Sequence, residues 1–267
     1  MLKLIKKRCN ARLISIIIPN YKKLDLLKIT LDCLNTQTDK NFEVIVSDDG
    51  TPIDDINNFI NINKFNFSLK VIWQRDIGCR ISKARNNGIL EANYDLFLIM
   101  DNDILLPPNF IEKIRRFEGM NYINVIPPIW SCVDMNDNDI MLKSSDRFSL
   151  IESLGSRLYH NEVFVSMWII SKDLLYAVNG FDELYDEYGY EDLDFRLRVD
   201  HFLEKNGRRS DILELHRHET PYVYHDHYKT RGIPSEHVRQ RFDQVSSTKL
   251  HKSKFGLDEP RTIVRLK

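Results

Sequence analysis

The strongest constraint on the fold is a repeated alternation of strand-like and helix-like segments in the first hundred residues. Apolar runs of strand length, rich in β-branched residues, occupy 15–19, 42–47, 69–73 and 96–100. Between them, apolar or small residues recur at helical spacing over 22–35, 53–63 and 81–92. This pattern predicts a mostly parallel central sheet flanked by helices, an α/β fold of the Rossmann-like kind. Ligands of such sheets bind beyond the carboxyl ends of the strands.

The alternation becomes irregular beyond Pro108. We expect 129–157 to be loop-like, followed by a strand over 163–170, a turn at 179–181, a helix over 193–203 and a short strand over 222–224. No internal repeat or linker divides the chain. The prediction is one domain over 13–231, with halves 13–107 and 108–231, between a basic N-terminal segment (1–12) and a basic, helical C-terminal tail (232–267).

The charge balance restricts the class of partner. Across 267 residues, 38 Lys and Arg stand against 39 Asp and Glu, a net charge of −1. This balance argues against a protein that binds nucleic acid over its whole surface, so we expect no nucleic-acid partner. No run approaches the roughly 18 apolar residues of a membrane helix. The scattered cysteines Cys9, Cys33, Cys79 and Cys132 indicate free thiols. We therefore expect a cytoplasmic protein.

The two ends of the chain are nevertheless basic. In 229–267, ten basic residues outnumber four acidic ones, and 1–12 holds five basic residues and no acidic one. These ends suggest peripheral contact with the inner face of an anionic cell membrane that carries a lipid-linked acceptor, or with a partner enzyme. An ordinary solvated surface explains the same charges.

Acidic residues follow the last strand of the first half. Asp101-Asn102-Asp103 comes directly after the run that ends at Met100. If the backbone stays extended there, Asp101 and Asp103 point to one side and Asn102 points away. Two carboxylates placed in this way suit a hard divalent cation completed by water and phosphate oxygens. An acidic turn without a ligand is the structural alternative.

A histidine-rich turn and an acidic segment lie in the second half. Imidazoles of His225 or His227 beside such carboxylates would favour Mn²⁺, whereas a surface turn is the alternative. Seven acids gather in 180–194 with several aromatic residues. Some of these acids cap a helix start. Carboxylates held against aromatic rings are also the composition of a sugar site with a general base.

Basic residues provide candidate contacts to a nucleotide. Arg75 and Arg85 follow the third strand, where an arginine fork can bind phosphate. Lys229 and Arg231 are candidate pyrophosphate contacts in a loop that could close over a bound nucleotide. Solvated surface charge is the alternative for both pairs.

Taken in order, these motifs resemble the family-two glycosyltransferases, which have a GT-A fold. The matching segments are 15–21 (SIIIPNY), 44–50 (VIVSDDG), Gly78 with 84–88 (ARNNG) and 98–103 (LIMDND). The second half is similar to the galactosyltransferase-type C-terminal region of chondroitin-polymerase and polypeptide N-acetylgalactosaminyltransferase relatives. That similarity is carried by 179–183 (NGFDE), 189–192 (GYED) and 223–225 (VYH).

The resemblance implies an inverting transfer of a sugar from a UDP-sugar to a hydroxyl group of a glycan, with Mn²⁺ or Mg²⁺ as cofactor, in bacterial surface polysaccharide synthesis. It implies that Asp192 is the general base and Glu191 a neighbouring acid that binds the acceptor. Metal ligands would be Asp103, His225 and Asp101, with Asp101 also near the ribose and sugar. Contacts to the nucleotide would come from Pro19, Asn20, Tyr21, Asp48, Asp49 and Arg85.

Two other functions fit parts of the sequence. A metal-dependent phosphohydrolase could use Asp101 as a nucleophile, but that class places its acidic pair near the start of the core, with a Thr soon after. A protein of the same fold that binds a nucleotide sugar or a glycan without turnover is the second. The chain keeps both the expected metal ligands and the expected base, which favours the transferase.

Overall fold

The computed structural model describes residues 13–115, 122–125, 129–131, 157–158, 167–186, 190–208, 212–215 and 223–225. In the first half, strands and helices alternate as predicted, with bounds that differ by one or two residues. They are β1 (Ile14–Asn20), α1 (Leu24–Asn35), β2 (Phe42–Asp48), α2 (Ile53–Ile62), β3 (Ser68–Trp73), α3 (Ile81–Leu90) and β4 (Leu96–Met100).

The second half contains shorter elements. They are β5 (Ile104–Leu105), α4 (Phe110–Ile114), β6 (Tyr122–Val125), β7 (Ile129–Ser131), β8 (Arg157–Leu158), β9 (Met167–Ser171), α7 (Lys172–Ala177), α8 (Glu191–Lys205), β10 (Ile212–Leu215) and β11 (Val223–His225). The prediction of a loop over 129–157 was wrong at both ends, where β7 and β8 lie, because strands of two or three residues are too short to show a period. Helix α8 also begins two residues before the predicted start.

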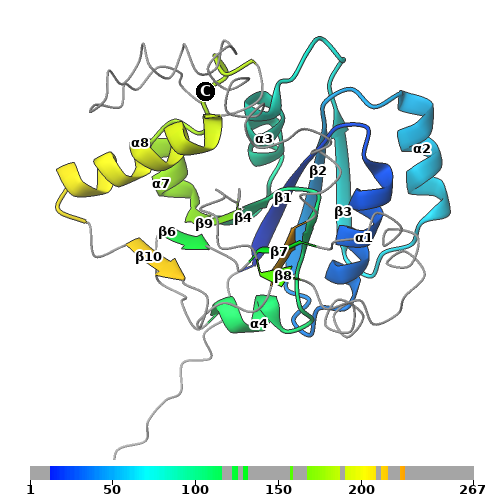
Figure 1. Ribbon diagram of the computed structural model, residues 1–267, viewed down its shortest axis with the longest axis horizontal. Coiled ribbons are helices and arrows are strands. Elements are labelled where there is room, and N and C mark those ends of the chain that lie inside the picture. Colours follow the sequence, from blue (N-terminus) through cyan, green and yellow to red (C-terminus); the bar gives the residue numbers. More distant parts are fainter. Residues whose placement is uncertain are drawn as a thin grey trace, which may run out of the picture.

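Seven strands form the main sheet, in the order β10-β6-β9-β4-β1-β2-β3 (Figure 1). Strands β1, β2, β3 and β4 are parallel, and β9 runs antiparallel between β4 and β6. The expected mostly parallel sheet is thus confirmed. A second sheet, in the order β5-β11-β7-β8, was not predicted. It brings β11 beside β5, which follows the Asp101–Asp103 segment.

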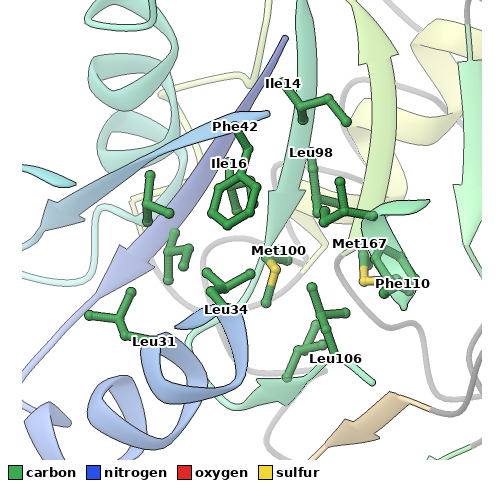
Figure 2. Close-up of a cluster of buried hydrophobic side chains, with 14 of the residues drawn as sticks. Ile14, Ile16, Leu31, Leu34, Phe42, Leu98, Met100, Leu106, Phe110 and Met167 are labelled. Carbon is green, nitrogen blue, oxygen red and sulfur yellow. The ribbon is translucent and has the colours of Figure 1, made fainter. Parts of the chain in front are cut away.

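Alternate residues of the central strands divide the core into two layers. Ile16 and Ile18 of β1 belong to a cluster with Leu31 of α1, and Figure 2 shows part of this cluster. Ile17 points to the other face and belongs to a second cluster that includes Phe195 of α8. Helices α1, α2 and α4 therefore cover one face of the sheet, and α3, α7 and α8 cover the other (Figure 1).

Helix α3 approaches the sheet closely through Gly88. A Cβ atom at this position would lie 2.6 Å from Cγ2 of Ile17 on β1. A glycine is therefore needed for the backbone of α3 to reach this depth. Of the cysteines, Cys33 and Cys79 lie in the described residues and are free thiols. None of the helices that the structure describes is long and apolar enough to cross a membrane.

Candidate active site

The carboxyl ends of β1 and β2 lie side by side and are joined through buried polar groups. Asn20 and Asp48 are paired in register, and Nδ2 of Asn20 donates to Oδ2 of Asp48 at 2.6 Å. Oδ1 of Asp48 accepts from the backbone N–H groups of Gly50 and Thr51 at 3.0 and 2.7 Å. Asp48 therefore shapes the turn after β2 and has no exposed surface.

Asp49, the next residue, is held by groups that follow β3. Its Oδ1 accepts from Nε2 of Gln74 at 2.5 Å, and its Oδ2 accepts from the backbone N–H of Arg80 at 2.7 Å. Oε1 of Gln74 in turn accepts from Nδ2 of Asn87 on α3 at 2.8 Å. Gln74 was not predicted as a site residue, although it directly follows β3, and a position directly after a strand was the signal that identified the other polar residues.

Two of the residues predicted to contact the nucleotide lie at the surface of this edge. Tyr21 is 46% exposed, and its hydroxyl donates to Oδ2 of Asp76 at 3.1 Å. Lys22 forms an ion pair with the same carboxylate at 2.9 Å. Arg75 is exposed. Pro19 is buried within β1. The described part of this edge thus places Tyr21 where a ligand could contact it and Pro19 where it supports the strand.

The Asp101–Asp103 segment turns instead of remaining extended, so the assumed strand geometry was wrong. Asn102 does differ from its neighbours as expected, because it is buried whereas Asp101 and Asp103 are partly exposed. Nδ2 of Asn102 donates to Oδ1 of Asn20 at 2.6 Å, and the carbonyl of Asn102 accepts from the Thr30 hydroxyl at 2.7 Å. Asn20 therefore contacts two strand ends by hydrogen bonds.

Arg85 brings acidic residues of both halves together. The side chain of Arg85 is 1% exposed, and its Nη2 lies 2.9 Å from Oδ1 of Asp101. Its Nη1 lies 2.6 Å from Oδ1 of Asp192 and 3.4 Å from Oε1 of Glu191. The guanidinium also lies over the rings of Trp168 and Phe181, 5.6 and 5.0 Å from their centroids. Arg85 was predicted to contact the nucleotide. In the structure its guanidinium contacts Asp101, Asp192 and Glu191.

The same cluster changes the protonation of its members. Burial would lower the pKa of Arg85, but the charges of Asp192, Asp101 and Glu191 raise it above its ordinary value. Burial and the charge of Asp192 raise the pKa of Glu191 to about 8, against the opposing effect of Arg85. The site therefore favours the protonated form of Glu191, which can act as a hydrogen-bond donor.

Two acids of this cluster, Glu191 and Asp192, lie at the start of helix α8. Tyr190 adopts a left-handed conformation, with φ of 67°, directly before the helix. Glu191 and Asp192 then occupy the first turn, where the helix dipole favours negative charge. The preceding turn is held to α3 by Asn86, which donates to the carbonyl of Phe181 at 2.8 Å and accepts from its N–H at 2.9 Å.

The residues predicted to bind a metal are compatible with a divalent cation. Asp101 and Asp103 would supply oxygen ligands, which hard cations prefer. In the backbone, His225 of β11 pairs with Ile104 of β5, so it lies in register beside the residue that follows Asp103. Among the side chains that the structure describes, no three His, Cys, Asp or Glu residues form a complete site. His227, Lys229 and Arg231 lie outside the described residues, as do segments 1–12 and 232–267.

The chain is similar in sequence to proteins that transfer sugars. Residues 15–176 match the model of the family described as Glycosyl transferase family 2. The chain is 25% identical over 285 residues to validoxylamine A glucosyltransferase of Streptomyces hygroscopicus subsp. jinggangensis (strain 5008), a match that covers 95% of this chain and 63% of that protein. It is 24% identical over 289 residues to chondroitin synthase of Pasteurella multocida (strain Pm70), covering 85% and 29%.

Solved structures confirm the predicted GT-A fold. A mannosyltransferase from Pyrobaculum calidifontis in complex with GDP-Man and Mn²⁺ matches with a TM-score of 0.58 and 16% identity, over 92% of this chain and 65% of that one. S. aureus TarS 1–349 in complex with UDP-GlcNAc matches with a TM-score of 0.54 and 18% identity, over 80% and 58%. The chain thus spans less than two thirds of the length of each of these proteins.

Proposed function

Since the chain belongs to glycosyl transferase family 2, we propose that it transfers a sugar from a UDP-sugar to a hydroxyl group of a glycan, in an inverting reaction that depends on Mn²⁺ or Mg²⁺. The observation that carries this proposal is the shared contact of Arg85 with Asp101 and Asp192. It brings an acid at the end of β4, where ligands of parallel sheets bind, next to an acid from the second half. Sugar transfer needs one group near the donor and another near the acceptor, and Asp101 and Asp192 would provide the two.

The nucleoside would bind at the ends of β1 and β2. Asp49 lies at this edge with its carboxylate oriented by Gln74 and Arg80. A carboxylate accepts hydrogen bonds, so it suits the N–H edge of uracil. TarS bound to UDP-GlcNAc supports a uracil donor, whereas the mannosyltransferase bound to GDP-Man makes a guanine nucleotide the competing choice.

The diphosphate would lie near Asp101 and Asp103. These carboxylates would hold the divalent cation together with His225. When bound, the cation would supply positive charge that offsets the charge on the leaving nucleoside diphosphate. The Mn²⁺ in the mannosyltransferase structure supports this cofactor. Lys229 and Arg231 remain proposed contacts to the pyrophosphate.

Asp192 would act as the general base. The acceptor oxygen forms a bond to the anomeric carbon while the bond from that carbon to the diphosphate oxygen breaks. The diphosphate leaves with the electron pair, and the hydroxyl proton passes to the Asp192 carboxylate. A single displacement from the opposite face inverts the anomeric configuration. Glu191 would bind a neighbouring group of the acceptor.

The acceptor would be a growing glycan of a bacterial surface polysaccharide, in a capsule or lipopolysaccharide. The chondroitin synthase relative, whose name denotes a polysaccharide-forming protein, supports this choice. A lipid-linked acceptor would place the protein in the cytoplasm at the inner face of the membrane, with the basic ends in contact with anionic lipid. Membership of the glycosyltransferase family argues against the phosphohydrolase alternative.

The test is a donor panel of UDP-, GDP- and dTDP-sugars with Mn²⁺, in which nucleotide release and glycan extension are measured. We expect release from one UDP-sugar, abolished by EDTA and by Asp103→Asn. Asp95→Asn is the matched control, because its side chain is 85% exposed and it precedes β4 at the opposite end of the strand. If a GDP-sugar is the preferred donor, the uracil assignment is wrong. Tight binding of a nucleotide sugar without turnover on any acceptor would indicate the inactive binding protein.

A further inference from the structure

A buried chain of hydrogen bonds crosses three adjacent strand ends and reaches the middle of the Asp101–Asp103 segment. Nδ2 of Asn20 donates to Oδ2 of Asp48, and Nδ2 of Asn102 donates to Oδ1 of Asn20, each at 2.6 Å. The exposed fractions of Asp48, Asn20 and Asn102 are 0%, 3% and 7%. Because all three side chains are buried, each of these polar groups depends chiefly on its protein partner.

Asp48 sets the direction of donation along this chain. Its Oδ1 accepts from two backbone N–H groups, and its Oδ2 accepts from the Thr51 hydroxyl at 2.7 Å. The Thr51 oxygen itself accepts from the Lys22 backbone N–H at 2.8 Å, so its own proton is directed to Asp48. Both oxygens of Asp48 therefore act as acceptors, because the groups that bond to them are donors.

The orientation of both amides follows from that constraint. Asn20 must turn its NH₂ group toward Asp48, which leaves its carbonyl oxygen facing Asn102. Residue 102 must therefore donate. The backbone on the other side is also held, because the carbonyl of Asn102 accepts from the Thr30 hydroxyl of α1. The residue between the two acids is thus fixed by its side chain and by its main chain.

We propose that Asn102 is a positioning residue that sets the placement of Asp101 and Asp103 through the directed chain from Asp48 to Asn20 to Asn102. The proposal rests on the function proposed above for the two acids, and it adds the requirement that residue 102 be a hydrogen-bond donor. The turn after β2, which lies beside the nucleoside site, and the turn after β4, which lies beside the diphosphate site, are then held at a fixed separation.

Reversing the direction of these hydrogen bonds gives a direct test. Asn102→Asp places an acceptor against the Asn20 oxygen, and Asn20 cannot turn over while Asp48 needs its NH₂ group. The double variant Asp48→Asn/Asn102→Asp moves the carboxylate to the other end. The amide introduced at position 48 can still accept from the two backbone N–H groups, while its NH₂ group donates to Asn20 and to the Thr51 oxygen, whose hydroxyl proton then turns away. Asn20 in turn donates to the carboxylate introduced at position 102. Asn102→Ala removes the donor without adding a charge.

The experiment measures the melting temperature, the Kd for Mn²⁺ and the KM for the nucleotide sugar at pH 8. We expect Asn102→Asp and Asn102→Ala to lower the melting temperature and to weaken Mn²⁺ binding by about 10- to 100-fold, the usual effect of losing a group that orients metal ligands. The double variant should recover most of both properties. Because Asn102→Asp and the double variant carry the same carboxylate at position 102, a recovery of the double variant relative to Asn102→Asp cannot come from that charge.

Asn93→Asp is the matched control. Asn93 is also an amide that donates to a carboxylate, that of Glu43, at 2.7 Å, but it precedes β4 at the opposite end of the sheet. This variant should lower the melting temperature and leave the Kd for Mn²⁺ and the KM unchanged.

Each arm can overturn a separate part of the proposal. If the double variant is no more stable than Asn102→Asp, the proposed direction of the hydrogen bonds is wrong. If its stability recovers but Mn²⁺ binding and KM do not, the positioning role is wrong. A wild-type protein that binds neither Mn²⁺ nor a nucleotide sugar would overturn the proposed function and the positioning role together, while the melting temperatures would still report the direction of the hydrogen bonds.

Discussion

Arg85 and Asp192, which are 107 residues apart in the sequence, form a direct ion pair with Nη1 and Oδ1 2.6 Å apart. The Arg85 side chain is 1% exposed and the Asp192 side chain 20%, so the pair lies at the boundary between the core and the site. The other end of the guanidinium contacts Asp101. One buried cation thus connects α3, α8 and the end of β4.

Removal of this cation should destabilise the protein strongly. We expect Arg85→Gln to lower the free energy of unfolding by about 3–5 kcal/mol, because it removes the buried cation that offsets the clustered acids Asp192, Asp101 and Glu191. Arg85→Lys keeps the charge but loses the fork that reaches two acids. We therefore expect it to lower kcat while reducing the free energy of unfolding less than Arg85→Gln does. Urea denaturation with Arg75→Gln as the exposed control checks this. Equal stability of Arg85→Gln and Arg75→Gln would contradict it.

Substitution of the proposed base should separate chemistry from binding. We expect Asp192→Asn to lower kcat by about 10²- to 10⁴-fold, the usual contribution of a general base, while the Kd for the donor changes little. Asp200→Asn, on the same helix with a side chain that is 37% exposed, is the control. Steady-state kinetics with donor binding by calorimetry measure both. A KM effect without a kcat effect would remove Asp192 from the chemical step.

Gly88 should be needed for α3 to pack closely on the sheet. We expect Gly88→Ala to cost about 1–3 kcal/mol, because the added methyl group meets Ile17 and the helix must shift. Since Arg85 lies on the same helix, kcat should fall as well. The double variant Gly88→Ala/Ile17→Ala removes the clashing atom, so its stability should exceed the additive value. Leu90→Ala, at a half-exposed position on α3, is the control. Additive losses in the double variant would exclude the clash.

Glu191 should make stability fall with rising pH. Its pKa in the folded protein, about 8, lies above the ordinary value of 4.5, so the folded state keeps a proton that the unfolded state releases. The resulting stability is complete below pH 4.5 and is lost as the pH rises through 8. Arg85, Asp192 and Asp101 are the charged groups that act on it. We expect the melting temperature of the wild type to fall between about pH 5 and pH 8, relative to Glu191→Gln. Glu204→Gln, exposed on the same helix, should follow the wild type.

The first half of the fold was predictable because each strand and helix carries its own period. Val44 to Val46 and Leu98 to Met100 are buried runs that only a covered central strand accommodates. The second sheet was not predictable, because β5, β7 and β8 each contain only two or three residues. Such strands are defined by their partners across the chain and leave no periodic signal in the sequence. The strand predicted over 222–224 corresponds to β11, but the sequence did not indicate its partners.

The residues of the candidate site were predictable, but the contacts between them were not. Spacing along the chain identified Asp101, Asp192 and Arg85 as polar residues near strand or helix ends. It did not show that Arg85 contacts acids from both halves of the chain, or that Asn20 joins two strand ends. Those contacts depend on how α3 and α8 pack on the sheet, which is a property of the whole fold. The polar groups between elements were therefore the part that sequence reasoning missed.

Three consecutive residues of α3 each reach a different segment: Arg85 the acids, Asn86 the turn at Phe181, and Asn87 the Gln74 side chain. Successive helical residues point about 100° apart, so a single rotation of the helix satisfies all three contacts. An insertion within α3 would turn the later residues away from their partners, even if every side chain were retained. Relatives that share this site should therefore vary in length in the loop before Ile81 and keep the length between Ile81 and Asn87 constant.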